Sequence, residues 1–198
     1  ALLQASITCG CPEWSSVPRG SCVAHSVSLS ARILHGSDER KMPIKDEPAV
    51  EAVLFDLDGT LLDTLDDLTD TANAVLAARG FPPRTREEMK IFVGDGIVML
   101  CRRILPESAR DEKTVLECVS LFREIYRKKW NAKTRPYPGV AGMLAELSRM
   151  GLSLAILSNK PDATTKMTVE WFFPDVPWKL VLGEREGTPR KPDPCAAL

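Results

Sequence analysis

The chain has 198 residues, of which 26 are Lys or Arg and 27 are Asp or Glu, so its formal net charge at pH 7 is −1. This length allows one domain with an extra segment or insertion. The near-neutral charge offers no basic field for nucleic acid and no cationic face for a membrane surface. The longest apolar runs fall well short of the roughly 20 residues of a membrane-spanning helix. We therefore expect neither nucleic acid nor a membrane as a partner.

Residues 1–46 are rich in Ser and lack sustained hydrophobic periodicity, which predicts an unpatterned, disordered leader. Two interpretations of residues 1–41 remain open. They form a targeting peptide, or they are an extension ahead of a natural start at Met42, after which regular patterning begins. We favour the second. The six Cys residues form no CxxC pair, which suits thiols in a reducing compartment, and we expect a cytoplasmic protein.

Hydrophobic periodicity predicts three short strands separated by helices. The strands are expected at residues 50–55, 152–157 and 179–182. The helices are expected at residues 64–79, 140–150 and 161–173, with a helical block at 85–130 that breaks at 94–96 and at 106. The alternation after this block predicts an α/β fold with a doubly wound parallel sheet. The block has no strand pattern, so we place it as an all-helical insertion after the first strand.

These patterns divide the chain into three parts. Residues 1–46 are the leader, residues 47–63 and 136–198 form the α/β core, and residues 64–135 form the helical insertion. The last residues resemble the opening of a further helix, and we expect the chain to be a fragment of a longer protein.

Polar residues follow each predicted strand. Asp56 and Asp58 come after the first, Ser158 and Asn159 after the second, and Lys191 lies in the loop after the third. Because the carboxyl ends of parallel strands meet at one edge of a sheet, we expect these side chains to share a crevice. Two carboxylates, a hydroxyl and an ammonium group in one crevice indicate phosphoryl transfer.

The spacing of Asp56 and Asp58 supports this chemistry, since residues two apart in an extended segment point to the same side. One carboxylate can attack phosphorus while the other exchanges protons with the leaving group and the hydrolytic water. Two anions beside a phosphate need cations, and Mg²⁺ together with a Lys ammonium group commonly supplies them. Gly59 allows the sharp turn that brings the backbone near the phosphate.

Three segments resemble motifs of the haloacid dehalogenase superfamily of phosphatases. Residues 56–63 (DLDGTLLD) are similar to its first motif, residues 158–160 (SNK) to its second, and residues 191–194 (KPDP) to its third. The resemblance implies a Rossmann-like α/β core and identifies the helical insertion as a C1 cap. Residues 94–100 (GDGIVML) and 137–140 (YPGV) resemble the phosphoglycolate phosphatase branch.

The resemblance also implies roles for individual residues. Asp56 would be the nucleophile and a Mg²⁺ ligand, and Asp58 would be the general acid/base, with its main-chain carbonyl also facing the metal. The phosphoryl group would be held by Thr60, Ser158, Asn159 and Lys191. The chain ends before the superfamily's fourth motif, which supplies another metal carboxylate, so the resemblance indicates a truncated member.

Other residues keep two interpretations. The turn formed by Gly94, Asp95 and Gly96 is either a helix break or a cap loop that closes over the substrate and selects it. Lys160 either contacts a substrate carboxylate or is an exposed lysine at a helix start. We expect Asp63 to be the N-cap of the helix beginning at Thr64. Asp66, Asp67 and Asp70 are expected to form a solvated helix face.

The sequence therefore predicts a Mg²⁺-dependent phosphomonoester hydrolase that forms an aspartyl-phosphate intermediate. Its partner would be a small-molecule phosphate ester, with 2-phosphoglycolate favoured by the resemblance, and the protein would be a monomer or a homodimer. The alternatives are a pyrophosphatase or a sugar-phosphate mutase on the same fold, and a non-catalytic phosphate-binding module.

Overall fold

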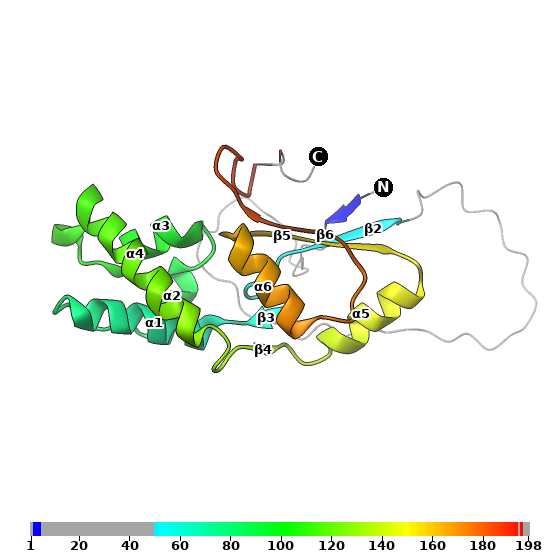
Figure 1. The fold of residues 1–198 in the computed structure, drawn as a ribbon, viewed down its shortest axis with the longest axis horizontal. Helices are drawn as coiled ribbons and strands as arrows, with labels where there is room; N and C mark the ends of the chain where they lie inside the picture. The colour runs from blue at the N-terminus through cyan, green and yellow to red at the C-terminus, as the bar shows by residue number, and fades with distance from the viewer. Residues whose placement is uncertain (1, 5–49, 194, 196–198) are drawn as a thin grey trace, which may run out of the picture.

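The computed structural model describes residues 2–4, 50–193 and 195 (Figure 1). Its strands are β1 (Leu2–Gln4), β2 (Ala52–Phe55), β3 (Leu62–Asp63), β4 (Arg135–Pro136), β5 (Ser153–Pro161) and β6 (Trp178–Glu184). Its helices are α1 (Leu65–Ala78), α2 (Arg86–Phe92), α3 (Gly96–Ile104), the short 3₁₀ helix η1 (Glu107–Ala109), α4 (Glu112–Lys129), α5 (Val140–Arg149) and α6 (Asp162–Phe172). None of the helices in these residues combines the length and the apolar run needed to cross a bilayer.

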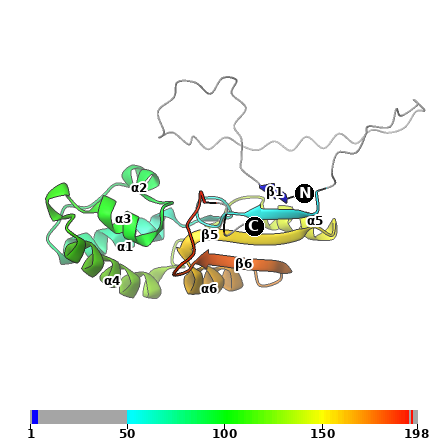
Figure 2. The same cartoon turned by 90° about the horizontal axis from the view of Figure 1, so that it is seen from above.

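Four strands form one parallel sheet in the order β1-β2-β5-β6 (Figure 2). The α/β prediction is confirmed. In both views α5 and α6 lie on one face of this sheet, as right-handed crossovers place them when successive strands are added in one direction. The core between sheet and helices is apolar, and its fully buried side chains include Leu57, Leu144, Leu154 and Ile156.

The leader contributes one strand that the sequence analysis did not predict. Residues Leu2–Gln4 form β1 and pair in parallel with β2, in register with Ala52–Leu54. An edge strand needs only backbone hydrogen bonds to join a sheet, so a three-residue strand carries no periodicity by which to recognise it. The remainder of the predicted leader, residue 1 and residues 5–46, lies outside the described residues.

Helices α1 to α4 pack around a second apolar core, separate from that of the sheet. Leu76, Met89, Ile104 and Leu105 are completely buried in it. Helix α1 ends at Ala78 with Arg79 as its C-cap, and Gly80 follows as the predicted C′ residue, with a φ of 71° and its amide donating to the carbonyl of Ala77 at 3.1 Å. These helices extend away from the strand ends of the sheet (Figure 1).

The two chain segments that connect the helices to the sheet lie side by side. β3 and β4 form a two-stranded antiparallel sheet in which Leu62 pairs with Pro136 and Asp63 with Arg135. The chain thus leaves and re-enters the α/β part at one place. Such paired connections hold the helical part in a defined position next to the carboxyl ends of β2 and β5.

Three local predictions are wrong. The N-cap of α1 is Thr64, whereas Asp63 accepts a hydrogen bond from the amide of Leu65 and forms an ion pair with Arg86. Asp67 is buried and does not belong to a solvated face, because its carboxylate accepts hydrogen bonds from the chain at residues 133–134. The middle strand, predicted to end at 157, continues to 161.

Candidate active site

The chain turns sharply after β2 and places Asp56 and Asp58 at the carboxyl edge of the sheet. The amide of Leu62 donates to the carbonyl of Leu57 at 3.1 Å, and the amide of Gly59 donates back to the carbonyl of Leu62 at 2.8 Å. Gly59 has a φ of 81°, a left-handed conformation that strains any residue with a Cβ atom. The tight turn therefore depends on glycine at this position.

Lys191 approaches this turn from the loop after β6. Its ammonium nitrogen donates to Oδ1 of Asp56 and to the carbonyl of Leu157, both at 2.7 Å. The side chain of Asn159 holds the backbone of Lys191 in place. Its Oδ1 accepts a hydrogen bond from the Lys191 amide at 2.9 Å, and its Nδ2 donates one to the Lys191 carbonyl at 3.2 Å. The predicted grouping of these residues at one edge of the sheet is present in the structure.

Lys160 makes the corresponding contact with Asp58. Its ammonium nitrogen lies 3.0 Å from Oδ1 of Asp58 and 2.9 Å from the hydroxyl of Tyr126, which comes from α4. Only 6% of the Lys160 side chain is exposed, so the interpretation as an exposed lysine at a helix start is wrong. Burial alone lowers the pKa of Lys160, but the Asp58 carboxylate and the Tyr126 hydroxyl outweigh burial and raise it above its ordinary value. Lys160 is therefore a charged ammonium group.

Ser158 lies on the extension of β5 past its predicted end. Its side chain is buried, and its oxygen accepts a hydrogen bond from the amide of Lys160 at 3.2 Å. Because a hydroxyl has one proton to donate in addition to its acceptor sites, Ser158 can still donate to a ligand. The strand extension thus holds the Ser158 hydroxyl in a fixed position beside Asp56 and Asp58.

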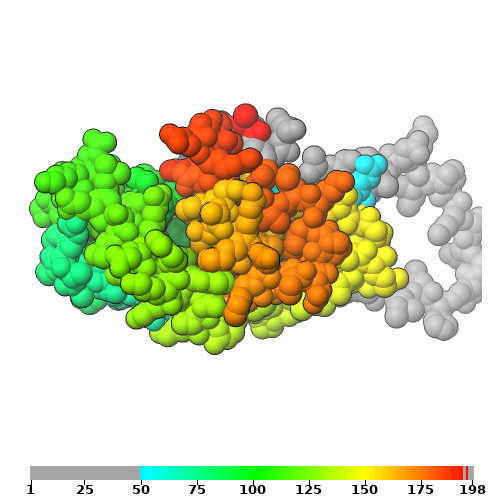
Figure 3. Space-filling view, viewed as in Figure 1, coloured from blue at the N-terminus to red at the C-terminus, as the bar shows by residue number. Residues whose placement is uncertain are grey.

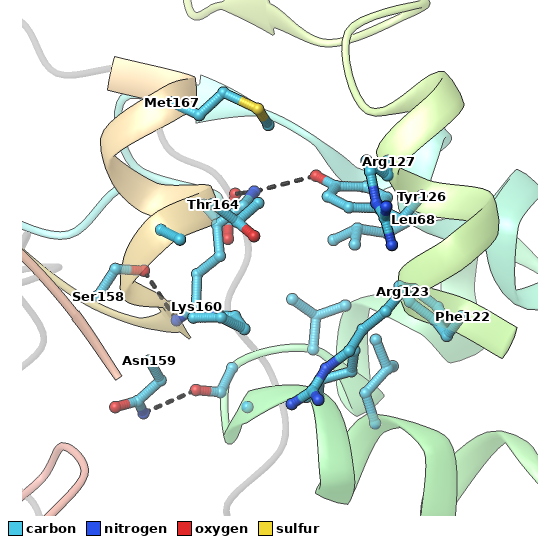
Figure 4. A pocket seen from close by; sticks show the side chains of 18 of the residues that line it. Leu68, Phe122, Arg123, Tyr126, Arg127, Ser158, Asn159, Lys160, Thr164 and Met167 are labelled. Atoms are coloured by element: carbon cyan, nitrogen blue, oxygen red, sulfur yellow. Dashed lines mark hydrogen bonds and ion pairs between the residues drawn. The ribbon is translucent and has the colours of Figure 1, made fainter. Parts of the chain in front are cut away.

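A cavity of about 390 Å³ lies between the helices and the carboxyl edge of the sheet. Figure 3 shows the boundary between α4 and α6 where it lies, and Figure 4 shows its interior. From the sheet side and α6 the cavity is lined by Asp56, Asp58, Ser158, Asn159, Lys160, Pro161, Ala163, Thr164 and Met167. From the helical side it is lined by Leu68, Val93, Gly94, Gly96, Ile97, Leu100, Phe122, Arg123, Tyr126 and Arg127. Of the predicted site residues, Thr60, Asp95 and Lys191 do not line it.

The loop at Gly94, Asp95 and Gly96 contacts the sheet side directly. The carbonyl of Gly94 accepts a hydrogen bond from the Asn159 side chain at 2.9 Å. Asp95 is exposed and forms an ion pair with Arg103 of α3, the helix that follows the loop. The backbone of this loop, rather than the Asp95 carboxylate, therefore reaches the cavity.

Asp56 and Asp58 supply part of the ligand set that a divalent cation needs. Oδ1 of Asp56 accepts hydrogen bonds from the ammonium group of Lys191 and from the amide of Leu57. No hydrogen bond from the described residues reaches Oδ2. Within the described residues, no group of three or more His, Cys, Asp and Glu side chains could hold a metal ion. Mg²⁺ commonly binds through one or two carboxylates, with water and substrate phosphate filling the other positions. Asp56 and Asp58 fit such a partial site.

Comparison with known proteins identifies the family. Residues 53–197 match the haloacid dehalogenase-like hydrolase family, which is most of the chain. The chain belongs to this family. The match covers the three segments that carry the acidic, hydroxyl and lysine residues described above.

The chain is similar in sequence to several phosphoglycolate phosphatases. Phosphoglycolate phosphatase 1 of Pseudomonas aeruginosa is 34% identical over 150 residues, which are 74% of this chain and 55% of that protein. Phosphoglycolate phosphatase of Neisseria meningitidis is 35% identical over 73% of this chain and 63% of that protein. The chain thus spans less than two thirds of the length of either relative.

A solved structure of similar fold is a predicted phosphoglycolate phosphatase from Haemophilus somnus. It is 25% identical and has a TM-score of 0.70, with coverage of 75% of this chain and 68% of that one.

Among the cavity residues that the sequence analysis did not predict are three polar residues of one helix. Arg123, Tyr126 and Arg127 all come from α4 and reach the cavity from the helical side (Figure 4). Their spacing of three and four residues places them on one helix face, which was the available signal. The sequence did not indicate that this face points toward the strand ends, because only tertiary packing brings α4 there.

Proposed function

We propose that this protein is a phosphomonoester hydrolase that acts on a small phosphorylated metabolite through a phosphorylated Asp56, with 2-phosphoglycolate as the leading substrate. The names of the relatives support this choice. The observation that carries it is the contact between Lys191 and Asp56 beside a cavity. A carboxylate with one oxygen held by an ammonium group and the other free of hydrogen bonds from the described residues is suited to nucleophilic attack.

In the first step, Oδ2 of Asp56 attacks phosphorus and the bond between phosphorus and the ester oxygen breaks. Asp58 enters this step protonated, donates that proton to the leaving oxygen and becomes the carboxylate that Lys160 contacts. Lys191 neutralises charge that accumulates between the attacking carboxylate and the phosphoryl oxygens, and the Ser158 hydroxyl donates to one of those oxygens.

In the second step, water attacks the phosphorus of the acyl phosphate. Asp58 accepts the proton of this water, and the bond between phosphorus and Oδ2 breaks. The products are inorganic phosphate and the Asp56 carboxylate. Lys160, held between Asp58 and Tyr126, keeps the Asp58 side chain oriented toward the reacting atoms.

The proposal includes Mg²⁺ as cofactor, held by Asp56 and Asp58. The ion, when bound, offsets the repulsion between the two carboxylates and the phosphate. Oδ1 of Asp56, the oxygen that does not attack phosphorus, and the main-chain carbonyl of Asp58 would be the ligands from these two residues.

We also propose that residues 64–135 act as a cap over the site. Its paired connections at β3 and β4 and its contact from Gly94 to Asn159 support this role. A cap in this position excludes bulk water from the acyl phosphate while the leaving group departs.

The test is phosphate release from 2-phosphoglycolate by the full-length protein with Mg²⁺. We expect turnover in the unaltered protein and a loss of about 10³-fold or more in Asp56→Asn, since the nucleophile is removed. Asp175→Asn is the control, because Asp175 is an exposed carboxylate outside the cavity. Undiminished turnover in Asp56→Asn would overturn the proposed mechanism.

The same assay separates the alternatives. Release of two phosphates from pyrophosphate or isomerisation of a sugar phosphate, without hydrolysis of phosphate monoesters, would favour those activities. Binding of a phosphate ester with no turnover would favour a non-catalytic module. A fluoroberyllate adduct that forms on the unaltered protein and not on Asp56→Asn would identify the nucleophile independently of turnover.

A further inference from the structure

The helical wall of the cavity is mostly apolar and carries charge at two positions. Its side chains include Leu68, Val93, Ile97 and Phe122, and its charged residues are Arg123 and Arg127. No acidic residue of the helical part lines the cavity. Ligand pockets commonly combine apolar walls with a few placed polar groups that fix the ligand's orientation.

The two arginines lie one turn apart on α4 and are directed into the cavity from that helix (Figure 4). Within the described residues, neither forms an ion pair, although the nearby Lys128 of the same helix pairs with Glu124 at 3.1 Å. Like charges four residues apart destabilise a helix. Arg123 and Arg127 are exposed residues that line the cavity and form no ion pair with the described residues, so both guanidinium groups are available to an anion in the cavity.

The other cations of the cavity region are already engaged. Lys191 contacts Asp56, and Lys160 contacts Asp58 and the Tyr126 hydroxyl. These two ion pairs balance the two carboxylates. A substrate that brings a second negative group in addition to its phosphate therefore finds its free counter-charge on α4.

We propose that Arg123 and Arg127 form a second anion-binding subsite, which binds the carboxylate of a phosphorylated carboxylic acid and so determines specificity for such substrates. This inference rests on the proposed function and adds the group that recognises the leaving part of the substrate. A planar guanidinium group matches a carboxylate through two parallel hydrogen bonds, which a neutral leaving group cannot accept in that way. It assigns to the arginines the substrate contact that the sequence analysis considered for Lys160.

The experiment compares two esters that differ in the carboxylate. Binding of 2-phosphoglycolate and of ethyl phosphate is measured by titration calorimetry in the presence of Mg²⁺, on the full-length protein carrying Asp56→Asn so that neither ester is consumed. We expect 2-phosphoglycolate to bind more tightly. Arg123→Gln and Arg127→Gln should each reduce this preference by about tenfold, as loss of a charged hydrogen bond does, with little change for ethyl phosphate.

Lys129→Gln is the matched control, because it removes a positive charge from the same helix at an exposed position outside the cavity. It should leave the preference unchanged. An equal loss in Lys129→Gln would show a general field effect and overturn the assignment. A preference that persists in Arg123→Gln, in Arg127→Gln and in the double variant would also overturn it.

The outcomes separate this inference from the proposed function. Equal binding of the two esters would overturn the carboxylate subsite and leave the phosphatase proposal in place. Failure of both esters to bind would overturn this inference, whereas the phosphatase proposal is tested separately by phosphate release from the unaltered protein.

Discussion

The ammonium nitrogen of Lys191 lies 2.7 Å from Oδ1 of Asp56, although 135 positions separate the two residues. The Lys191 side chain is 26% exposed and that of Asp56 is 43% exposed. Solvent screens an ion pair this accessible, so it contributes little to folding. The pair therefore matters mainly for the charge it holds beside the cavity.

This separation of roles gives the first prediction. Lys191→Met should lower phosphate release by about 10²-fold or more, because a positively charged donor to the reacting group is lost. The free energy of unfolding should change by less than about 1 kcal/mol. Activity and urea unfolding are measured on the same preparation, with Lys179→Met, an exposed lysine of β6, as control. Retention of full activity in Lys191→Met would contradict the role assigned to this residue.

A second prediction concerns the buried carboxylate of Asp67. Its Oδ2 accepts from the amide of Thr134 at 2.8 Å and from the Thr134 hydroxyl at 2.7 Å, which ties α1 to the chain after α4. Asp67→Ala should destabilise the protein by about 2–4 kcal/mol, because the buried donors lose their acceptor.

Asp70→Ala is the comparison for Asp67. Asp70 is exposed and forms an ion pair with Lys133, so its removal should cost less than about 1 kcal/mol. Urea unfolding of the two variants measures the difference. Equal effects would show that the hydrogen bonds to Asp67 add nothing beyond a surface charge.

Two glycines predict opposite effects of the same substitution. A Cβ atom at Gly183 of β6 would lie 2.5 Å from Cα of Asp162 and 2.6 Å from the carbonyl oxygen of Lys160, both backbone atoms that cannot move aside cheaply. Gly183→Ala should therefore destabilise the protein by about 1–3 kcal/mol or more.

Gly142 lies in α5, and a Cβ atom there meets nothing within 4 Å. Gly142→Ala should stabilise the protein by about 0.5–1 kcal/mol, since alanine loses less conformational freedom in a helix. Thermal unfolding of both variants tests the pair. A neutral Gly183→Ala would mean that β6 and α6 are less closely packed than the structure shows.

The acid dependence of stability follows from Asp162 at the start of α6. Burial alone raises the pKa of Asp162, but hydrogen bonds from Lys166 and from the amide of Gly183 outweigh it and lower the pKa below its ordinary value of 3.8. A lowered pKa in the folded state means that the stabilisation is complete above pH 3.8 and is lost as the pH falls through the folded-state pKa.

Unfolding of the unaltered protein and of Asp162→Asn by urea at pH 6, 4 and 2.5 measures this dependence. We expect the difference in free energy of unfolding between them to be largest at pH 6 and to shrink toward pH 2.5. A difference that stays constant over this range would mean that the carboxylate's charge does not contribute.

Much of the fold could be predicted because hydrophobic periodicity is a local property. Regularly spaced apolar residues predict the buried strand before Asp56, the helix that precedes Gly80 and the helical stretches up to Trp130. Errors occurred where a longer-range contact prevails over local preference. From its position in the sequence Asp67 is expected on the surface, but it is buried because Thr134 donates hydrogen bonds to its carboxylate. Strand β5 continues to Pro161 because it pairs with β6.

The sequence by itself determined which polar side chains share the candidate site, because an acid pair after a strand, a hydroxyl after the next and a lysine in a later loop are brought to one edge of a parallel sheet. Only the tertiary structure decided which of these groups touch. It pairs Asp56 with Lys191 and Asp58 with Lys160, and it turns Arg123 of α4 toward the cavity. The physical reason is that periodicity defines which face of a helix is apolar, whereas the packing of whole elements determines what its polar side chains face.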